Sequence, residues 1–197
     1  MQRRIICQSI IASFLLVFLL INCDAALAHK GHAGPPKIFM DEEEALKTML
    51  PEGGKVVRRK EELKKEKYNE AVKQWGYSPD AGIYSYFISK GKEGELSGVL
   101  FIRSVEYKHG GIGLAVSYDR KGELTGLKIL SCSEKYMEKI KENIQSNGFL
   151  YKFLHLTTEK VIALGKSFNQ EPSESLQHIF AGEIGGTAIL LKIFQGL

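Results

Sequence analysis

The sequence predicts an α+β domain in which an antiparallel meander of strands is flanked by N-terminal and C-terminal helices. The hydrophobic pattern has a helical period up to Trp75 and changes to strand alternation from Tyr77. Four segments rich in β-branched and aromatic residues follow one another, separated by short turn-forming stretches. Helical patterns return after Cys132. Runs of strands bracketed by runs of helices are typical of α+β domains.

The first residues have the order of a secretory signal peptide. A basic start at residues 3–4 precedes an apolar block at residues 5–21, and Ala-Leu-Ala at residues 26–28 is a small-x-small cleavage motif. We therefore expect an exported protein, cleaved after Ala28, in the periplasm or on the outer face of the cytoplasmic membrane. Two alternatives stay open: an uncleaved membrane anchor, because the block approaches bilayer-spanning length, and lipid attachment at Cys23.

Cleavage changes the charge and the cysteine content only slightly. Losing residues 1–28 removes two arginines and one aspartate, so the formal net charge of +4 falls to +3. This mild excess is not typical of nucleic-acid binding, and we expect no nucleic-acid partner. Cys7 and Cys23 leave with the signal, so Cys132 has no partner for an internal disulfide. We expect Cys132 to be a buried, inert thiol.

A leader rich in Gly and Pro, residues 29–37, is expected to be flexible, followed by one domain at residues 38–197. His29 and His32 suggest a copper or nickel site. Two ligands on a flexible segment make a weak site, however, so we expect a solvated tail and no metal. His155 and His178 show no partner pattern.

The order of elements follows from caps, breakers and periodicity. Asp41 predicts the N-cap of a helix that ends at Pro51, and Gly76 predicts the end of a charged helix that starts at Glu61. Between these helices, KVVRRK at residues 55–60 is a candidate short strand. The expected meander strands span residues 83–89, 97–107, 111–119 and 123–132. The expected C-terminal helical segments span residues 137–144, 151–156, 161–168 and 187–194.

Sequence motifs that carry their own chemistry are absent. The sequence contains no Walker loop, nucleophile elbow, metalloprotease helix or CxxC pair. This excludes most hydrolases and structural zinc modules. It leaves an electron carrier open, because the cofactor supplies the chemistry of such a protein.

The stretch KHGGIGLAVSYDRKGELTGLKILSCSE and the earlier stretch IFMDEEEALKTMLPEGGKVVRRKEEL resemble the FMN-binding domain family. That family includes the flavin-carrying C subunit of the sodium-translocating NADH:quinone reductase and the G subunit of the Rnf complex. The resemblance extends from about Ile38 to about Thr187. It rests on the residues Gly110, Gly111, Ile112, Asp119, Gly122, Leu124, Gly126, Ile129, Leu130, Ser133 and Glu134.

The signature of that family is Asp-x-x-Ser-Gly-Ala-Thr before the last helix, and it corresponds here to AGEIGGT at residues 181–187. In the family a dedicated flavin transferase joins the final Thr to the FMN phosphate, which places Thr187 at the attachment position. The match is incomplete, because Ala181, Ile184 and Gly186 replace the Asp, Ser and Ala. The family's His-x-Glu-Thr element has also become Glu134-Lys135.

The resemblance implies that Gly185, Gly186 and Thr187 open the last helix and bind the FMN phosphate, with backbone N–H groups and the helix dipole facing the anion. The lost signature residues disfavour covalent attachment at Thr187 more than they disfavour non-covalent binding. A turn followed by a buried helix is the alternative for the same stretch.

Further flavin neighbours follow from the same resemblance. Glu134, Lys135 and His109 are expected close to the cofactor, with Lys135 supplying charge to the phosphate. His109 has an alternative role as an exposed turn residue. Aromatic residues are expected mainly to fill the core, with stacking on a flavin ring as the alternative; these are Trp75, Tyr77, Tyr84 and Tyr86.

The sequence therefore predicts an exported FMN-binding electron-transfer protein of the cell envelope. It would relay electrons between redox partner proteins, membrane-bound ones included, and would not turn over a substrate of its own. The alternative is a derivative of the fold that has lost its flavin and acts as a binding or scaffolding module in the envelope.

Overall fold

The chain divides into two compact units, Met1–Gly34 and Pro35–Leu197. The computed structural model describes residues 34–108, 110–169 and 175–197, so the second unit contains every element named below. The predicted signal peptide lies outside the described residues.

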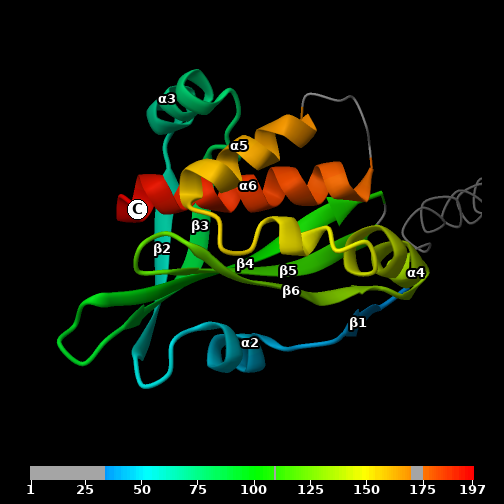
Figure 1. Ribbon diagram of the computed structural model, residues 1–197, viewed down its shortest axis with the longest axis horizontal. Helices are drawn as coiled ribbons and strands as arrows, with labels where there is room; N and C mark the ends of the chain where they lie inside the picture. Colours follow the sequence, from blue (N-terminus) through cyan, green and yellow to red (C-terminus); the bar gives the residue numbers. More distant parts are fainter. Residues whose placement is uncertain (1–33, 109, 170–174) are drawn as a thin grey trace, which may run out of the picture. The chain divides into compact units, whose positions relative to one another are not determined.

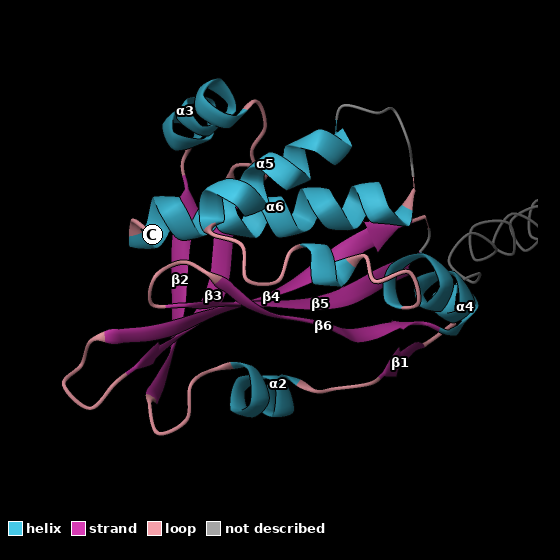
Figure 2. Cartoon of the chain, viewed as in Figure 1, coloured by secondary structure: helices cyan, strands magenta, loops and turns pink. Residues whose placement is uncertain are grey.

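Six strands form one antiparallel sheet in the order β1-β6-β5-β4-β3-β2 (Figure 2). Four consecutive strands, β3 to β6, are neighbours in the sheet, as expected for a meander. The predicted α+β class is therefore confirmed. The strands are β1 (Pro36–Ile38), β2 (Lys55–Leu63), β3 (Gly82–Lys90), β4 (Leu96–Tyr107), β5 (Gly110–Asp119) and β6 (Leu124–Ser133).

Helices cover both faces of the sheet (Figure 1). Helices α5 and α6 lie together over one face, and the short helix α2 lies under the other. Among the helices of the described residues, none combines the length and the apolar character that crossing a bilayer requires. The helical elements are α2 (Glu42–Met49), α3 (Lys65–Trp75), η1 (Glu134–Tyr136), α4 (Met137–Ile140), η2 (Lys141–Gln145), η3 (Leu150–Lys152), α5 (Thr158–Asn169) and α6 (Leu176–Gln195).

The turn between β5 and β6 shows why the four meander strands were predictable. Asp119 accepts hydrogen bonds through its Oδ1 from the backbone N–H groups of Lys121 (2.8 Å) and Glu123 (2.9 Å). Gly122 adopts a positive φ of 78°, which a residue without a Cβ tolerates easily. The side chain of Asp119 and the freedom of Gly122 thus fix the hairpin locally.

The N-terminal half departs from the prediction at two places. Strand β2 runs to Leu63, so the segment expected to open the charged helix at Glu61 belongs instead to a nine-residue strand paired with β3. The pairing with β3 favours a strand over a helix here, because it buries the side chain of Leu63 in the sheet. Pro36 and Lys37, expected in the flexible leader, pair with Ser133 and Cys132 of β6.

The predicted helix ends are confirmed where a cap determines them. The side chain of Asp41 accepts a hydrogen bond from the backbone N–H of Glu44 at 2.8 Å. Gly76 caps α3 in the left-handed conformation, with its N–H donating to the carbonyl of Val72. Both caps use residues that the sequence alone identifies.

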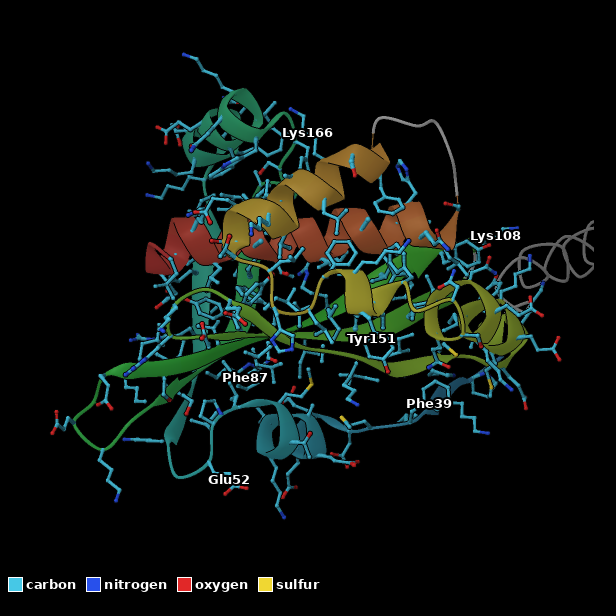
Figure 3. All side chains as sticks on the ribbon, in the orientation of Figure 1. Phe39, Glu52, Phe87, Lys108, Tyr151 and Lys166 are labelled. Atoms are coloured by element: carbon cyan, nitrogen blue, oxygen red, sulfur yellow. The ribbon has the colours of Figure 1, made fainter. Side chains whose placement is uncertain are left out.

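One core lies between α2 and the sheet face beneath it. Phe87 of β3 points from the sheet toward α2 (Figure 3). The buried members of this cluster are Ala45, Leu50, Phe87, Leu100, Ala115 and Leu130.

A second, aromatic core lies on the α6 side of the sheet. The ring of Tyr86 stacks between Phe101, with centroids 5.2 Å apart, and Phe194, with centroids 5.7 Å apart. Its hydroxyl accepts a hydrogen bond from Gln195 Nε2 at 2.6 Å. Tyr86 is thus a core residue that locks the end of α6 onto the sheet.

Candidate functional site

The segment Gly185 to Thr187 lies in the middle of α6, so the expectation that it opens the last helix is wrong. Helix α6 starts at Leu176, where the N-cap Ser175 accepts a hydrogen bond from the N–H of His178 at 3.2 Å. The N–H groups of residues 185–187 therefore lie in the interior of the helix, where they bond to carbonyls one turn earlier. They are not free to bind a phosphate.

A sequence signal for this longer helix exists upstream of the glycines. Leu176, Phe180, Ile184 and Ala188 recur every four residues, and all four are buried. The apolar stripe thus continues unbroken through the glycine pair. This periodicity predicts a helix that begins before the glycines, whereas the resemblance of residues 181–187 to a helix-opening signature predicts one that begins at them.

Gly185 allows a close helix crossing. A Cβ at Gly185 would overlap the hydroxyl of Tyr77 and lie 3.3 Å from Gly165 Cα of α5. A Cβ at Gly165 would lie 2.8 Å from the carbonyl oxygen of Ala181. The hydroxyl of Tyr77 fills the crossing point and donates a hydrogen bond to the carbonyl of Ile162 at 3.1 Å. Gly185 is therefore explained by packing.

Thr187 belongs to a buried hydrogen-bond chain. Its hydroxyl donates to the carbonyl of Ile184 at 2.7 Å and lies 2.8 Å from the hydroxyl of Tyr118. When the single proton of the Thr187 hydroxyl goes to Ile184, Tyr118 donates to Thr187; the hydroxyl of Tyr118 also lies 3.4 Å from the same Ile184 carbonyl. Thr187 has no exposed surface. Burial also raises the pKa of Tyr118, which keeps this phenol protonated as a donor.

Because of these contacts, the three residues predicted to bind the phosphate do not form one site. Gly185 faces α5 and Tyr77, and the hydroxyl of Thr187 is fully engaged between Tyr118 and Ile184. Attachment of a flavin at Thr187 would require that this buried chain open first. Gly186 lines a cleft, which is described below.

The other predicted flavin neighbours are not brought to the segment 185–187. Glu134 and Lys135 are exposed on η1, directly after β6, and do not line the cleft that Gly186 lines. His109 lies outside the described residues. Cys132 is buried as expected, and burial raises the pKa of its thiol, which makes it a poor nucleophile.

A cleft of about 360 Å³ lies between α6, strands β3 and β4, and the loop before β3; we call it the Arg103 cleft. This size falls in the range of small-molecule sites. It is lined by Tyr77, Ser78, Pro79, Asp80, Tyr84, Arg103, His178, Ile179, Gly182, Glu183 and Gly186.

An ion pair crosses the Arg103 cleft. Arg103 Nε of β4 donates to Glu183 Oε1 of α6 at 2.5 Å, and both side chains are 25% exposed. The guanidinium also lies over the ring of Tyr84, 4.8 Å from its centroid. No local sequence pattern indicates this pair, because 80 positions separate the partners and the fold brings them together.

One residue of the Arg103 cleft lining carries an unsatisfied polar atom. Within the described residues, the buried Nδ1 of His178 has no hydrogen-bond partner. Buried polar atoms of this kind are uncommon in native proteins. His178, one of the residues that line the cleft, therefore carries a buried ring nitrogen whose hydrogen-bonding capacity is unused among the described residues.

The hydroxyls of the Arg103 cleft are already engaged with the backbone. Ser78 donates to the carbonyl of Pro79 at 2.9 Å, and Tyr84 donates to the carbonyl of Asp80 at 2.5 Å. Neither is paired with a base that would make it a nucleophile. Of the predicted aromatic residues, Tyr77 and Tyr84 line this cleft, whereas Trp75 lines a separate hollow between α3 and the end of α6.

The described residues offer no metal centre and one further cleft of note. In residues 34–108, 110–169 and 175–197, no group of three or more His, Cys, Asp or Glu side chains is placed to hold a metal ion. A cleft of about 470 Å³ lies between β6 and the segment from η2 to η3, with Leu127, Ile144 and Leu150 among its lining. We call it the β6 cleft.

Comparisons with models of protein families, with curated proteins and with solved structures found no match to this chain. The resemblance to the FMN-binding domain family therefore stays a prediction made from the residues.

The two adjacent glycines of α6 should respond oppositely to alanine. In Gly185→Ala the new methyl would overlap Tyr77, and we expect a loss of about 1–3 kcal/mol in the free energy of unfolding. In Gly186→Ala the nearest atom is Pro79 Cγ at 3.4 Å, an ordinary contact, so the better helix propensity of alanine should give a gain of up to about 1 kcal/mol. Urea denaturation measures both values, and equal effects would contradict the packing role of Gly185.

The Tyr118–Thr187 hydrogen bond should be measurable as a coupling. Thr187→Val keeps the shape but removes the hydroxyl 2.8 Å from Tyr118 and leaves Tyr118 the carbonyl of Ile184 at 3.4 Å, so we expect a loss of about 1–2 kcal/mol in the free energy of unfolding. A double-mutant cycle with Tyr118→Phe should show that the second substitution costs much less once the first is present. Additive effects would mean that the two hydroxyls do not depend on each other.

Proposed function

We propose that this protein is a binding module that holds a small molecule non-covalently in the Arg103 cleft and does not convert it. The observation that supports this most is that His178 lines a cleft of ligand size and carries a buried Nδ1 that lacks a partner within the described residues. An unsatisfied atom beside a cleft is what a site for an external hydrogen-bonding group looks like.

The walls of the Arg103 cleft suit binding more than catalysis. Pro79 and Ile179 offer apolar surface. Arg103 and Glu183 hold each other, and the hydroxyls of Ser78 and Tyr84 are engaged with backbone carbonyls, which leaves Asp80 and the ring of His178 as the polar groups open to a ligand. Fixed apolar walls with a few convergent polar groups are typical of ligand sites.

We place this binding module in the cell envelope because of the predicted signal peptide. The proposal agrees with the flavin-less alternative drawn from the sequence. Its partner is a small molecule met outside the cytoplasm, and no nucleic acid is implied.

Protein-detected NMR with a fragment library tests the proposal. The library should contain amines, neutral compounds and carboxylates in equal shares. We expect saturable shifts of backbone amides around Ile179, Gly182 and Glu183. Gly182→Leu, which adds a side chain at the wall of the cleft, should abolish these shifts.

The matched control for that experiment is Gln177→Leu, on the same helix but outside the lining of the Arg103 cleft. It should leave the shifts intact, and thermal unfolding should show that both variants are folded. If no fragment shifts the cleft amides, or if the hits gather at the β6 cleft, the proposed function is wrong.

A second candidate is the electron relay predicted from the sequence, with FMN held non-covalently. One observation favours it: Gly186 and Tyr84, both linked to flavin in that prediction, line the same cleft. Redox partner proteins at the envelope would then be its partners.

The electron relay makes its own prediction. Protein produced with and without a flavin transferase should show flavin absorbance after purification, and added FMN should raise the melting temperature. An intact mass without added flavin, a colourless protein and an unchanged melting temperature would remove this candidate. That result would leave the binding module untouched.

A further inference from the structure

The charges around the Arg103 cleft do not balance, and this bears on which ligand fits. This inference rests on the proposed binding function. Three charged side chains line the cleft: Asp80, Arg103 and Glu183. Arg103 and Glu183 neutralise each other across 2.5 Å, which leaves the carboxylate of Asp80 as the uncompensated charge of the lining.

The phenol of Tyr84 lies close to all three charges, and its pKa responds to each of them. Its pKa is raised, first by burial; Arg103 lowers it, whereas Glu183 and Asp80 each raise it. The hydroxyl also donates to the backbone carbonyl of Asp80 at 2.5 Å, which ties the loop before β3 to the sheet. All three charges therefore act on one point in the cleft.

Arg103, the one cation of the cleft lining, already makes two interactions. Arg103 Nε bonds to Glu183, and the guanidinium covers the ring of Tyr84. An incoming anion would have to compete with Glu183 for Arg103 while facing Asp80. A phosphate, with its double charge, would be repelled most.

The buried, unpartnered ring nitrogen of His178, a residue of the cleft lining, is compatible with a ligand that donates a hydrogen bond once it reaches the ring. Nδ1 of a neutral His178 accepts a hydrogen bond from an N–H group when its proton is on Nε2. The backbone N–H of His178 donates to the side chain of Ser175 in the helix cap. An ammonium ligand supplies both an N–H donor and a positive charge.

We infer that the Arg103 cleft selects a small organic cation, an amine attached to an aromatic or apolar group, over an anion of the same shape. The ammonium would be neutralised by Asp80 and would offer a donor to His178. The apolar part would lie against Pro79 and Ile179, which line the same cleft.

Three probes of one shape test this selectivity: benzylamine, benzyl alcohol and benzoate, titrated into the labelled full domain and followed by NMR. We expect benzylamine to bind roughly tenfold more tightly than benzoate, with benzyl alcohol between them, as a single partly screened charge would produce. Asp80→Asn should reduce the affinity for benzylamine by a similar factor and leave benzyl alcohol unchanged.

The control variant is Glu106→Gln on β4. Glu106 is exposed, does not line the cleft, and alternates with Arg103 to the opposite face of the strand. Glu106→Gln removes the same charge from the protein as Asp80→Asn. An equal loss of benzylamine binding in these two variants would show only a general charge effect and would overturn the inference.

The remaining outcomes separate the two proposals. If benzoate binds the cleft as tightly as benzylamine, or more tightly, cation selectivity is wrong and the binding module stands. If fragments of every charge leave the cleft amides unshifted, the proposed binding function is wrong, and the cation selectivity is wrong with it.

His178→Ala should weaken the binding of benzylamine and of benzyl alcohol together, because both would donate to Nδ1. Unchanged binding of both ligands would remove His178 from the site.

Discussion

The position of α6 depends on one close approach, where Gly185 meets Gly165 of α5 with the hydroxyl of Tyr77 between them. Because neither glycine carries a Cβ, the two helices can cross at this distance above the sheet. The approach turns Thr187 toward Tyr118 in the core and leaves the edge of α6 that carries Ile179, Gly182 and Gly186 facing the loop before β3. The Arg103 cleft is a consequence of that crossing, since one of its walls is this edge of α6.

Local chemistry explains which parts of the fold were predictable. The caps at Asp41 and Gly76 and the turn from Asp119 to Gly122 depend on residues close in sequence, and the prediction was right at each. Leu63 was assigned to a helix because its neighbours are charged and helix-forming, whereas its pairing with β3 is non-local. The three residues of β1 were missed for the same reason, because only β6 makes them a strand.

The candidate site was less predictable than the fold. Glycines before a threonine suggested a phosphate site at a helix start, but the same glycines are explained by a helix crossing, and the two roles differ only in where the helix begins. Arg103 and Glu183 carry no local pattern at all, since they meet across 80 positions. Gly186 and Tyr84 are the residues common to the predicted site and the observed cleft, and the functional proposals concentrate on that cleft.

Native-state hydrogen exchange of the amides of residues 185–187 tests most directly whether this segment is a buried helix interior. Amides inside α6 exchange only when the helix opens, so we expect protection close to that of global unfolding. Exchange of these amides near the rate of an unfolded peptide, slowed on addition of FMN, would contradict the helix interior and would restore the phosphate site at this segment.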